Sequence, residues 1–277
     1  MRVRKLIQEK DGNMKVQSKN FIGCLLIILS NGCAGSADTT LSPPSDTKWV
    51  NVEIKNPSPY TKPFPLEVVY ISHKCMKSRI NGVDGSREEK PSYNPVKIPL
   101  QQQESSNIWH AKIAINGSGS CEWKLSEFNL GIGYIDASHL GVNLVPDAFV
   151  GATVALDSAA SQNGKFENVI NNHLKYSPLY YPVIERWSQK KNSTRPDTVT
   201  LFGRKGSFWD VYLHSKSDED VFVMFYPVID EKKIVEMKLP YEKSAGKLIK
   251  FVYPNGEVIE TKNIVPDFDK LDKMIVK

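Results

Sequence analysis

Apolar and polar residues alternate with a period of two along much of the chain after residue 47, which is the pattern of strands that bury one face. Val50–Lys55 and Trp109–Ile115 show it most regularly, and Leu66–Ile71 is rich in β-branched and aromatic side chains. The sequence therefore predicts a mainly β fold. Further strands are expected at Cys121–Tyr134 with a bend near Ser126, and at Leu140–Val145, Phe149–Leu156, Thr198–Phe202, Phe208–His214, Val221–Tyr226, Ile234–Leu239, Leu248–Tyr253 and Glu257–Thr261.

Two glycine-containing segments predict tight turns between these strands. Pro254, Asn255 and Gly256 form the clearest hairpin signal, because Asn-Gly accommodates the left-handed backbone that short hairpins require. The segment Asn116–Gly119 (Asn-Gly-Ser-Gly) predicts a second turn.

A polar stretch of small residues, Asp157–Gly164, divides the strands into two groups and predicts a domain boundary. We expect residues 47–158 to form a disulfide-stapled β-sandwich and residues 165–277 to form a second antiparallel β domain. The predicted fold class is therefore two antiparallel β-sandwich-like domains, with a short helix near their junction.

The helix is predicted at 166–174, where apolar residues recur at spacings of three and four before Pro178. Three aromatic residues, Tyr180, Tyr181 and Trp187, then cluster around Pro182. Such a cluster indicates either an exposed recognition loop or ordinary packing in a core, and the sequence leaves both open.

The first 32 residues have the pattern of an export leader. An apolar run, Phe21–Leu29, follows Lys15 and Lys19, and its nine residues are too few for a membrane-spanning helix, which needs about 20. Starting at Met14 would give a compact leader, and the sequence leaves open whether translation begins at Met1 or Met14.

The segment Leu29–Cys33 (Leu-Ser-Asn-Gly-Cys) resembles the lipobox of bacterial lipoproteins, with Ser30 and Asn31 in place of the more usual Leu and Ala or Ser. The resemblance implies that Cys33 carries a lipid. Ala34 after it implies release to the outer membrane, with the protein on the periplasmic face. The alternative is a plain secretory protein with an ordinary thiol at Cys33. Residues 33–46 are small and polar with two prolines, and we expect them to be a lipidated cysteine and tether.

The positive charge of the chain lies mostly in this leader. The full chain has a formal charge of +5, but residues 1–32 contain six Lys or Arg and two Asp or Glu, which leaves +1 for the rest. A nearly neutral remainder gives no indication of nucleic-acid binding.

Two of the four cysteines are expected to pair. Cys24 lies in the leader and Cys33 is the lipid site, so Cys75 and Cys121 remain. An oxidising compartment favours a disulfide between them, which should stabilise the fold by roughly 4 kcal/mol in the chain-entropy model. Two free buried thiols are the alternative.

Motifs for catalysis and metal binding are absent from the sequence. There is no Gly-x-Ser-x-Gly nucleophile elbow, and Gly117–Ser120 has the wrong spacing for one. The five histidines, at positions 73, 110, 139, 173 and 214, are scattered singly, whereas zinc peptidases carry two that are one helical turn apart. We expect a protein that is not an enzyme and needs neither a cofactor nor a metal.

The acidic cluster Ser217–Asp220 lies between two predicted strands. It lacks the ligand spacing of a calcium loop, so a solvated hairpin tip is the simplest interpretation. Its carboxylates, on Asp218, Glu219 and Asp220, could nevertheless bind a basic partner.

An exported, lipid-tethered β protein without catalytic residues is most simply a binding protein. Its leader, Cys33, short tether and β domains together resemble the periplasmic immunity lipoproteins of type VI secretion systems, in particular those that neutralise phospholipase effectors. The resemblance rests on architecture and implies a toxin partner whose active site is occluded. We expect the candidate partner-binding residues to be Tyr180, Tyr181, Trp187, Asp218, Glu219 and Asp220.

The alternative function is a cell-envelope lipoprotein with a structural or glycan-binding role, in which exposed aromatics such as Tyr181 or Trp187 would contact sugars. Neither function predicts nucleic-acid binding. The sequence does not indicate an oligomeric state.

Overall fold

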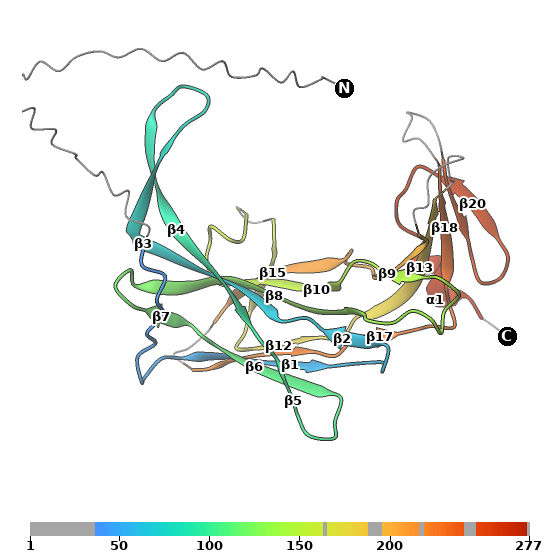
Figure 1. Ribbon diagram of the computed structural model, residues 1–277, viewed down its shortest axis with the longest axis horizontal. Helices are drawn as coiled ribbons and strands as arrows, with labels where there is room; N and C mark the ends of the chain where they lie inside the picture. The colour runs from blue at the N-terminus through green and yellow to red at the C-terminus, as the bar shows by residue number, and fades with distance from the viewer. Residues whose placement is uncertain (1–36, 163–164, 188–195, 216–218, 241–247, 276–277) are drawn as a thin grey trace, which may run out of the picture. The chain divides into compact units, whose positions relative to one another are not determined.

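The computed structural model describes residues 37–162, 165–187, 196–215, 219–240 and 248–275. Residues 37–277 form one compact unit. The described residues form strands and one short helix, which confirms the predicted mainly β fold with sandwich-like packing (Figure 1).

Two sheets form the main layers of this unit. The first has five strands in the order β12-β16-β1-β6-β5, and the second has six in the order β11-β15-β10-β8-β3-β4, with β2 and β7 paired to β8. The bounds of the first are β1 Trp49–Lys55, β5 Gln101–Gln102, β6 Ile108–Ala114, β12 His173–Tyr176 and β16 Val221–Phe225. Those of the second are β2 Thr61–Pro63, β3 Leu66–Ile80, β4 Arg87–Ile98, β7 Asn116–Ser118, β8 Trp123–Tyr134, β10 Val150–Ala155, β11 Glu167–Ile170 and β15 Phe208–His214.

A third sheet has the order β20-β19-β18-β13-β14-β9, with β17 paired to β13. Its strands are β9 Val145–Pro146, β13 Leu179–Trp187, β14 Thr198–Phe202, β17 Val228–Ile229, β18 Val235–Leu239, β19 Ile249–Val252 and β20 Val258–Thr261, and the helix α1 spans Phe268–Lys273.

Alternation along the strands creates a core between the first two sheets. Val52 of β1 and Phe128 of β8 are buried in one continuous cluster. Strand β13 joins this cluster to a second one, because Tyr180 packs in the main core and Tyr181, on the opposite face, packs with Leu271 of α1.

The two halves of the chain share these sheets. β1 pairs in parallel with β16, and β10 pairs in parallel with β15. The sheets therefore do not follow the predicted division into residues 47–158 and 165–277. Alternation within a strand predicts which side chains are buried, but it does not identify the neighbouring strand or its direction.

The helix predicted at 166–174 is wrong. This segment forms β11 and β12, and the turn at Asn171–Asn172 carries the chain from the second sheet to the first. The turn shifts the phase of alternation, so Val169 and Leu174 both pack against the core although five positions separate them. The apolar residues of two short strands that alternate in different phase therefore show the spacings of three and four that are typical of a helix.

The strand predicted at Leu140–Val145 is also wrong, because turns occupy most of it and β9 begins only at Val145. The bend predicted near Ser126 is confirmed, since the register of β8 against β3 shifts between Leu125 and Glu127. The Pro254–Gly256 hairpin is confirmed as well, with Gly256 at φ 84° between β19 and β20.

The close approach of β8 and β10 depends on glycine at position 151. A Cβ there would lie 1.8 Å from the carbonyl oxygen of Leu130. We expect Gly151→Ala to lower the free energy of unfolding by about 1–3 kcal/mol, as overpacking of a core does. Urea denaturation measures it, and the control is Gly82→Ala, where nothing lies within 4 Å of the added methyl. Equal effects of the two substitutions would contradict this steric account.

Candidate functional site

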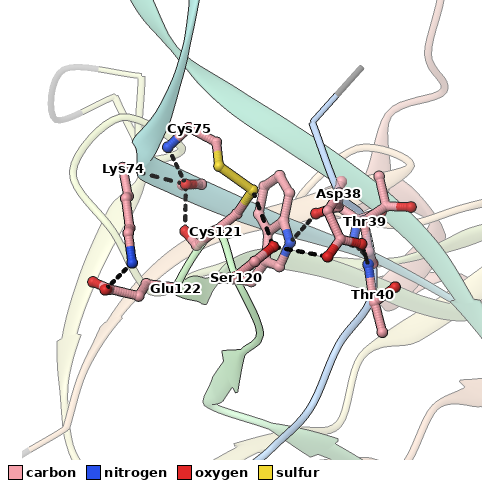
Figure 2. The surroundings of a disulfide bond; sticks show 11 residues. Asp38, Thr39, Thr40, Lys74, Cys75, Ser120, Cys121 and Glu122 are labelled. Carbon is pink, nitrogen blue, oxygen red and sulfur yellow. Dashed lines mark hydrogen bonds and ion pairs between the residues drawn. A yellow bond between two sulfur atoms is a disulfide. The ribbon is translucent and has the colours of Figure 1, made fainter. Parts of the chain in front are cut away.

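A disulfide fixes the point at which β3 leaves the second sheet. Cys75 and Cys121 are bonded, which confirms the predicted pair. The register of β3 against β4 shifts between Ser72 and Met76, so residues 73–75 form a bulge beside the edge strand. The disulfide ties this bulge to the loop that precedes β8 (Figure 2).

Ser72 connects the bulge to the same loop by hydrogen bonds. Its fully buried hydroxyl donates to the carbonyl oxygen of Cys121 and accepts from the backbone N–H of Cys75, 2.9 Å away. Lys74 also pairs with Glu122, with Nζ and Oε1 2.6 Å apart, and its ammonium lowers the pKa of Glu122 (Figure 2). The ion pair is solvent-exposed, so the disulfide and Ser72 are the main connections.

The start of the described chain docks on the other side of this loop. The carbonyl oxygen of Asp38 accepts from the indole Nε1 of Trp123 at 2.9 Å, and its carboxylate accepts from Ser120 (Figure 2). Hydrogen bonds from the Thr40 backbone and from Ser120 lower the pKa of Asp38. Part of the tether predicted at 33–46 therefore packs on the body from Ala37 onward.

Beyond the bulge, β3 and β4 continue as a two-stranded ribbon that extends past the rest of the sheet (Figure 1). We call residues 76–91 the outer ribbon. Nearly all its residues are exposed, including Ile80 and Val83 at its tip, which are 71% and 96% exposed. β4 forms the edge of the sheet and contains Pro91 and Pro95.

Cross-strand partners lie on the same face of the outer ribbon, so the register shows which charged side chains share a face. Lys77 lies opposite Lys90, and Arg79 lies opposite Glu88, all on one face. Like charges directly opposite each other destabilise a strand pair, and only Lys90 is relieved, by an ion pair with Glu88 at 2.8 Å. This face of the outer ribbon therefore carries three basic side chains and one carboxylate.

A cavity of about 730 Å³ lies at the foot of the outer ribbon. Its lining is aliphatic at Ile71, Ile115, Leu125, Leu156 and Leu213, and polar or charged at Lys48, His73, Asn116, Lys124, Asp157, His214, Ser215 and Glu219. The cavity thus combines an aliphatic part with polar and charged groups that could orient a bound group.

The electrostatic environment at one side of this cavity is acidic. Asp157 accepts from the backbone N–H groups of Ala159 and Ala160 through Oδ1, but its buried Oδ2 has no hydrogen-bond partner among the described residues. Burial, together with the charges of Asp157 and Asp210, raises the pKa of Glu127. One buried carboxylate oxygen of a cavity residue therefore lacks the hydrogen-bond partner that buried polar atoms usually have.

His214, in the cavity lining, has its ring engaged by neighbouring side chains. The ring of His214 is hydrogen-bonded to Asn168, with Nε2 and Oδ1 2.9 Å apart, and it packs against the ring of Tyr212. Within the described residues, no three His, Cys, Asp or Glu side chains are grouped so as to hold a metal ion.

The predicted partner-binding residues are dispersed. Tyr180 and Tyr181 are buried in β13, 0% and 1% exposed, so an exposed aromatic loop is wrong for both. Burial raises the pKa of each hydroxyl. Both faces of β13 are covered by core residues, so the consecutive side chains from Tyr180 to Ile184 are all buried. Trp187 is partly buried at the end of β13.

The acidic cluster is divided between two roles. Glu219 is exposed and lines the cavity, whereas Asp220 accepts from the backbone N–H of Trp49 at 2.9 Å and from Asn51, which fixes the start of β1. Asp218 lies outside the described residues, as do Cys33 and the leader. No helix in the described ranges is both long and apolar enough to span a bilayer.

Sequence reasoning missed the outer ribbon and most of the cavity. The signal for the ribbon was present in the glycine-flanked turn Asn81–Gly85 between two runs rich in Lys, Arg and Glu. The cavity residues come from separate strands and have no common sequence pattern.

The chain matches no family model, no curated protein and no solved structure.

Replacing both cysteines, in Cys75→Ala/Cys121→Ala, should lower the free energy of unfolding by roughly 4 kcal/mol, because the unfolded chain gains the freedom of a loop spanning 46 residues. Urea denaturation measures it. Dithiothreitol should destabilise the wild type and leave the double variant unchanged. A variant as stable as the oxidised wild type would contradict the role of the bond.

Glu127→Gln should raise stability at neutral pH. The folded pKa of Glu127 lies above its unfolded value, so the ionised form costs stability, and that cost grows as pH rises from the unfolded pKa of about 4.3 through the folded pKa. Unfolding measured across this range should show the variant's advantage at pH 7 disappearing toward low pH. An advantage independent of pH would indicate a different cause.

Proposed function

We propose that this chain is an envelope lipoprotein that binds a toxic secreted effector and occludes its active site, with the cavity at the foot of the outer ribbon as the recognition site. The observation that supports this best is the buried Oδ2 of Asp157, which lacks a hydrogen-bond partner among the described residues. A buried acceptor of this kind is costly unless a donor reaches it.

A basic or imidazole side chain of a partner would satisfy this acceptor once Asp157 turns it toward the cavity. Glu219 adds a second carboxylate at the cavity lining, so a cationic group entering there would meet two acceptors. Hydrolases that use a catalytic histidine present such a donor in their active sites. The proposal that the effector is a phospholipase rests on the architectural resemblance to immunity lipoproteins.

The aliphatic lining supports a protein partner. Ile71 and Leu125 would pack around the stem of an inserted side chain, while Lys48 and Lys124 would remain near solvent. A central group in a desolvated pocket surrounded by polar residues is the usual form of an interface hot spot. Lipidation at Cys33 would hold this interface at the membrane, where a lipid-degrading toxin acts.

The test is growth of cells that express a candidate phospholipase effector from the neighbouring gene, with and without this chain, together with binding of the two purified proteins. We expect protection by the wild type. Asp157→Asn should weaken binding at least about 30-fold, because it removes the negative charge that would pair with the partner's cationic group. The asparagine Oδ1 can still accept from the backbone N–H groups of Ala159 and Ala160.

Two further variants complete the test. Glu219→Lys should slow association, since it reverses a charge at the cavity, whereas Glu104→Lys, at an exposed site in the turn before β6, should bind as the wild type does. Absence of both binding and protection would overturn the proposal for that effector and favour the structural or glycan-binding alternative.

A further inference from the structure

The outer ribbon and the docked N-terminal segment meet at one corner of the fold. Ser120, which donates to Asp38, directly precedes Cys121 of the disulfide at the ribbon's base. Only residues 34–36 separate Cys33 from Ala37, and four Cα–Cα steps of 3.8 Å span at most about 15 Å. If Cys33 carries a lipid, which rests on the proposed function, this corner is held close to a bilayer surface.

The basic face of the outer ribbon suits such a surface. Lys77, Arg79 and Lys90 share it with one carboxylate, Glu88. Neither Lys77 nor Arg79 forms an ion pair with any residue that the structure describes. Their charges therefore remain available to an anionic partner.

The tip of the outer ribbon is aliphatic and exposed. Ile80 and Val83 project where no part of the described fold covers them, and Ile80 lies opposite Arg87, on the other face from Lys77 and Arg79. Asp84 beside them is turned toward its own loop, because its carboxylate accepts from the backbone and hydroxyl of Ser86. Exposed aliphatic residues next to cations are typical of segments that rest at a membrane interface.

We propose that the outer ribbon binds the anionic phospholipid headgroups of the membrane to which the chain is tethered, with Lys77, Arg79 and Lys90 on phosphates and Ile80 and Val83 in the interface. A membrane accounts for the aliphatic tip, the unpaired cations and the short connection to Cys33 together. An acidic protein would account for the cations alone.

The test uses the chain from residue 34 onward, without lipid, because residues 37–277 form a compact unit. Sedimentation with vesicles of phosphatidylcholine mixed with phosphatidylglycerol should exceed sedimentation with phosphatidylcholine alone, and salt should reduce it. Lys77→Glu/Lys90→Glu should weaken binding at least tenfold, from about fivefold per cation removed. Val83→Ser should weaken it as well.

The matched control is Lys55→Glu/Lys232→Glu, which changes the net charge equally at exposed lysines outside the outer ribbon. It should bind like the wild type. Equal sedimentation with both vesicle types, or equal losses in the two double variants, would overturn the proposal. So would an effector complex that needs Lys77 and Lys90 while vesicles do not bind. The measurement includes no effector, so the proposed function is tested separately.

Discussion

The Cys75–Cys121 disulfide, with the buried Ser72 hydroxyl beside it, is the constraint on which the arrangement of the outer ribbon, the cavity and the N-terminal segment depends. A bulge of three unpaired residues would ordinarily let an edge hairpin swing relative to its sheet. Here the covalent bond and Ser72 fix the bulge to the loop before β8, and the same loop holds the N-terminal segment through Trp123. The outer ribbon, the cavity and the start of the described chain thus share one rigid support.

The sandwich behind this support is stabilised by strands far apart in sequence. β16 completes the first sheet beside β1, and β15 completes the second beside β10, both in parallel. Asp220 strengthens the first of these junctions by capping the start of β1. Because Glu219 precedes Asp220, the pairing of β1 with β16 also positions one of the cavity's carboxylates.

Local sequence pattern predicted most strands, the disulfide and the bend near Ser126, because each depends on alternation or on a specific residue chemistry. It failed at 166–174, where a turn between sheets imitates a helical period, and at Tyr180 and Tyr181, whose burial depends on two cores meeting across β13. Of the proposed partner-binding residues, Glu219 reaches the cavity. Tyr180, Tyr181, Trp187 and Asp220 lie elsewhere, because tertiary packing, which no local pattern records, decides which strands meet.

The two prolines of β4 limit the ways in which a partner can bind the outer ribbon. Pro91 and Pro95 have no backbone N–H, so the edge strand offers an interrupted row of donors to an incoming strand. An extended peptide is therefore less able to bind by adding a strand to the edge of the sheet. Recognition is left to side chains on the faces and tip, so a few surface substitutions can change what this end of the molecule binds while the backbone beneath them stays the same.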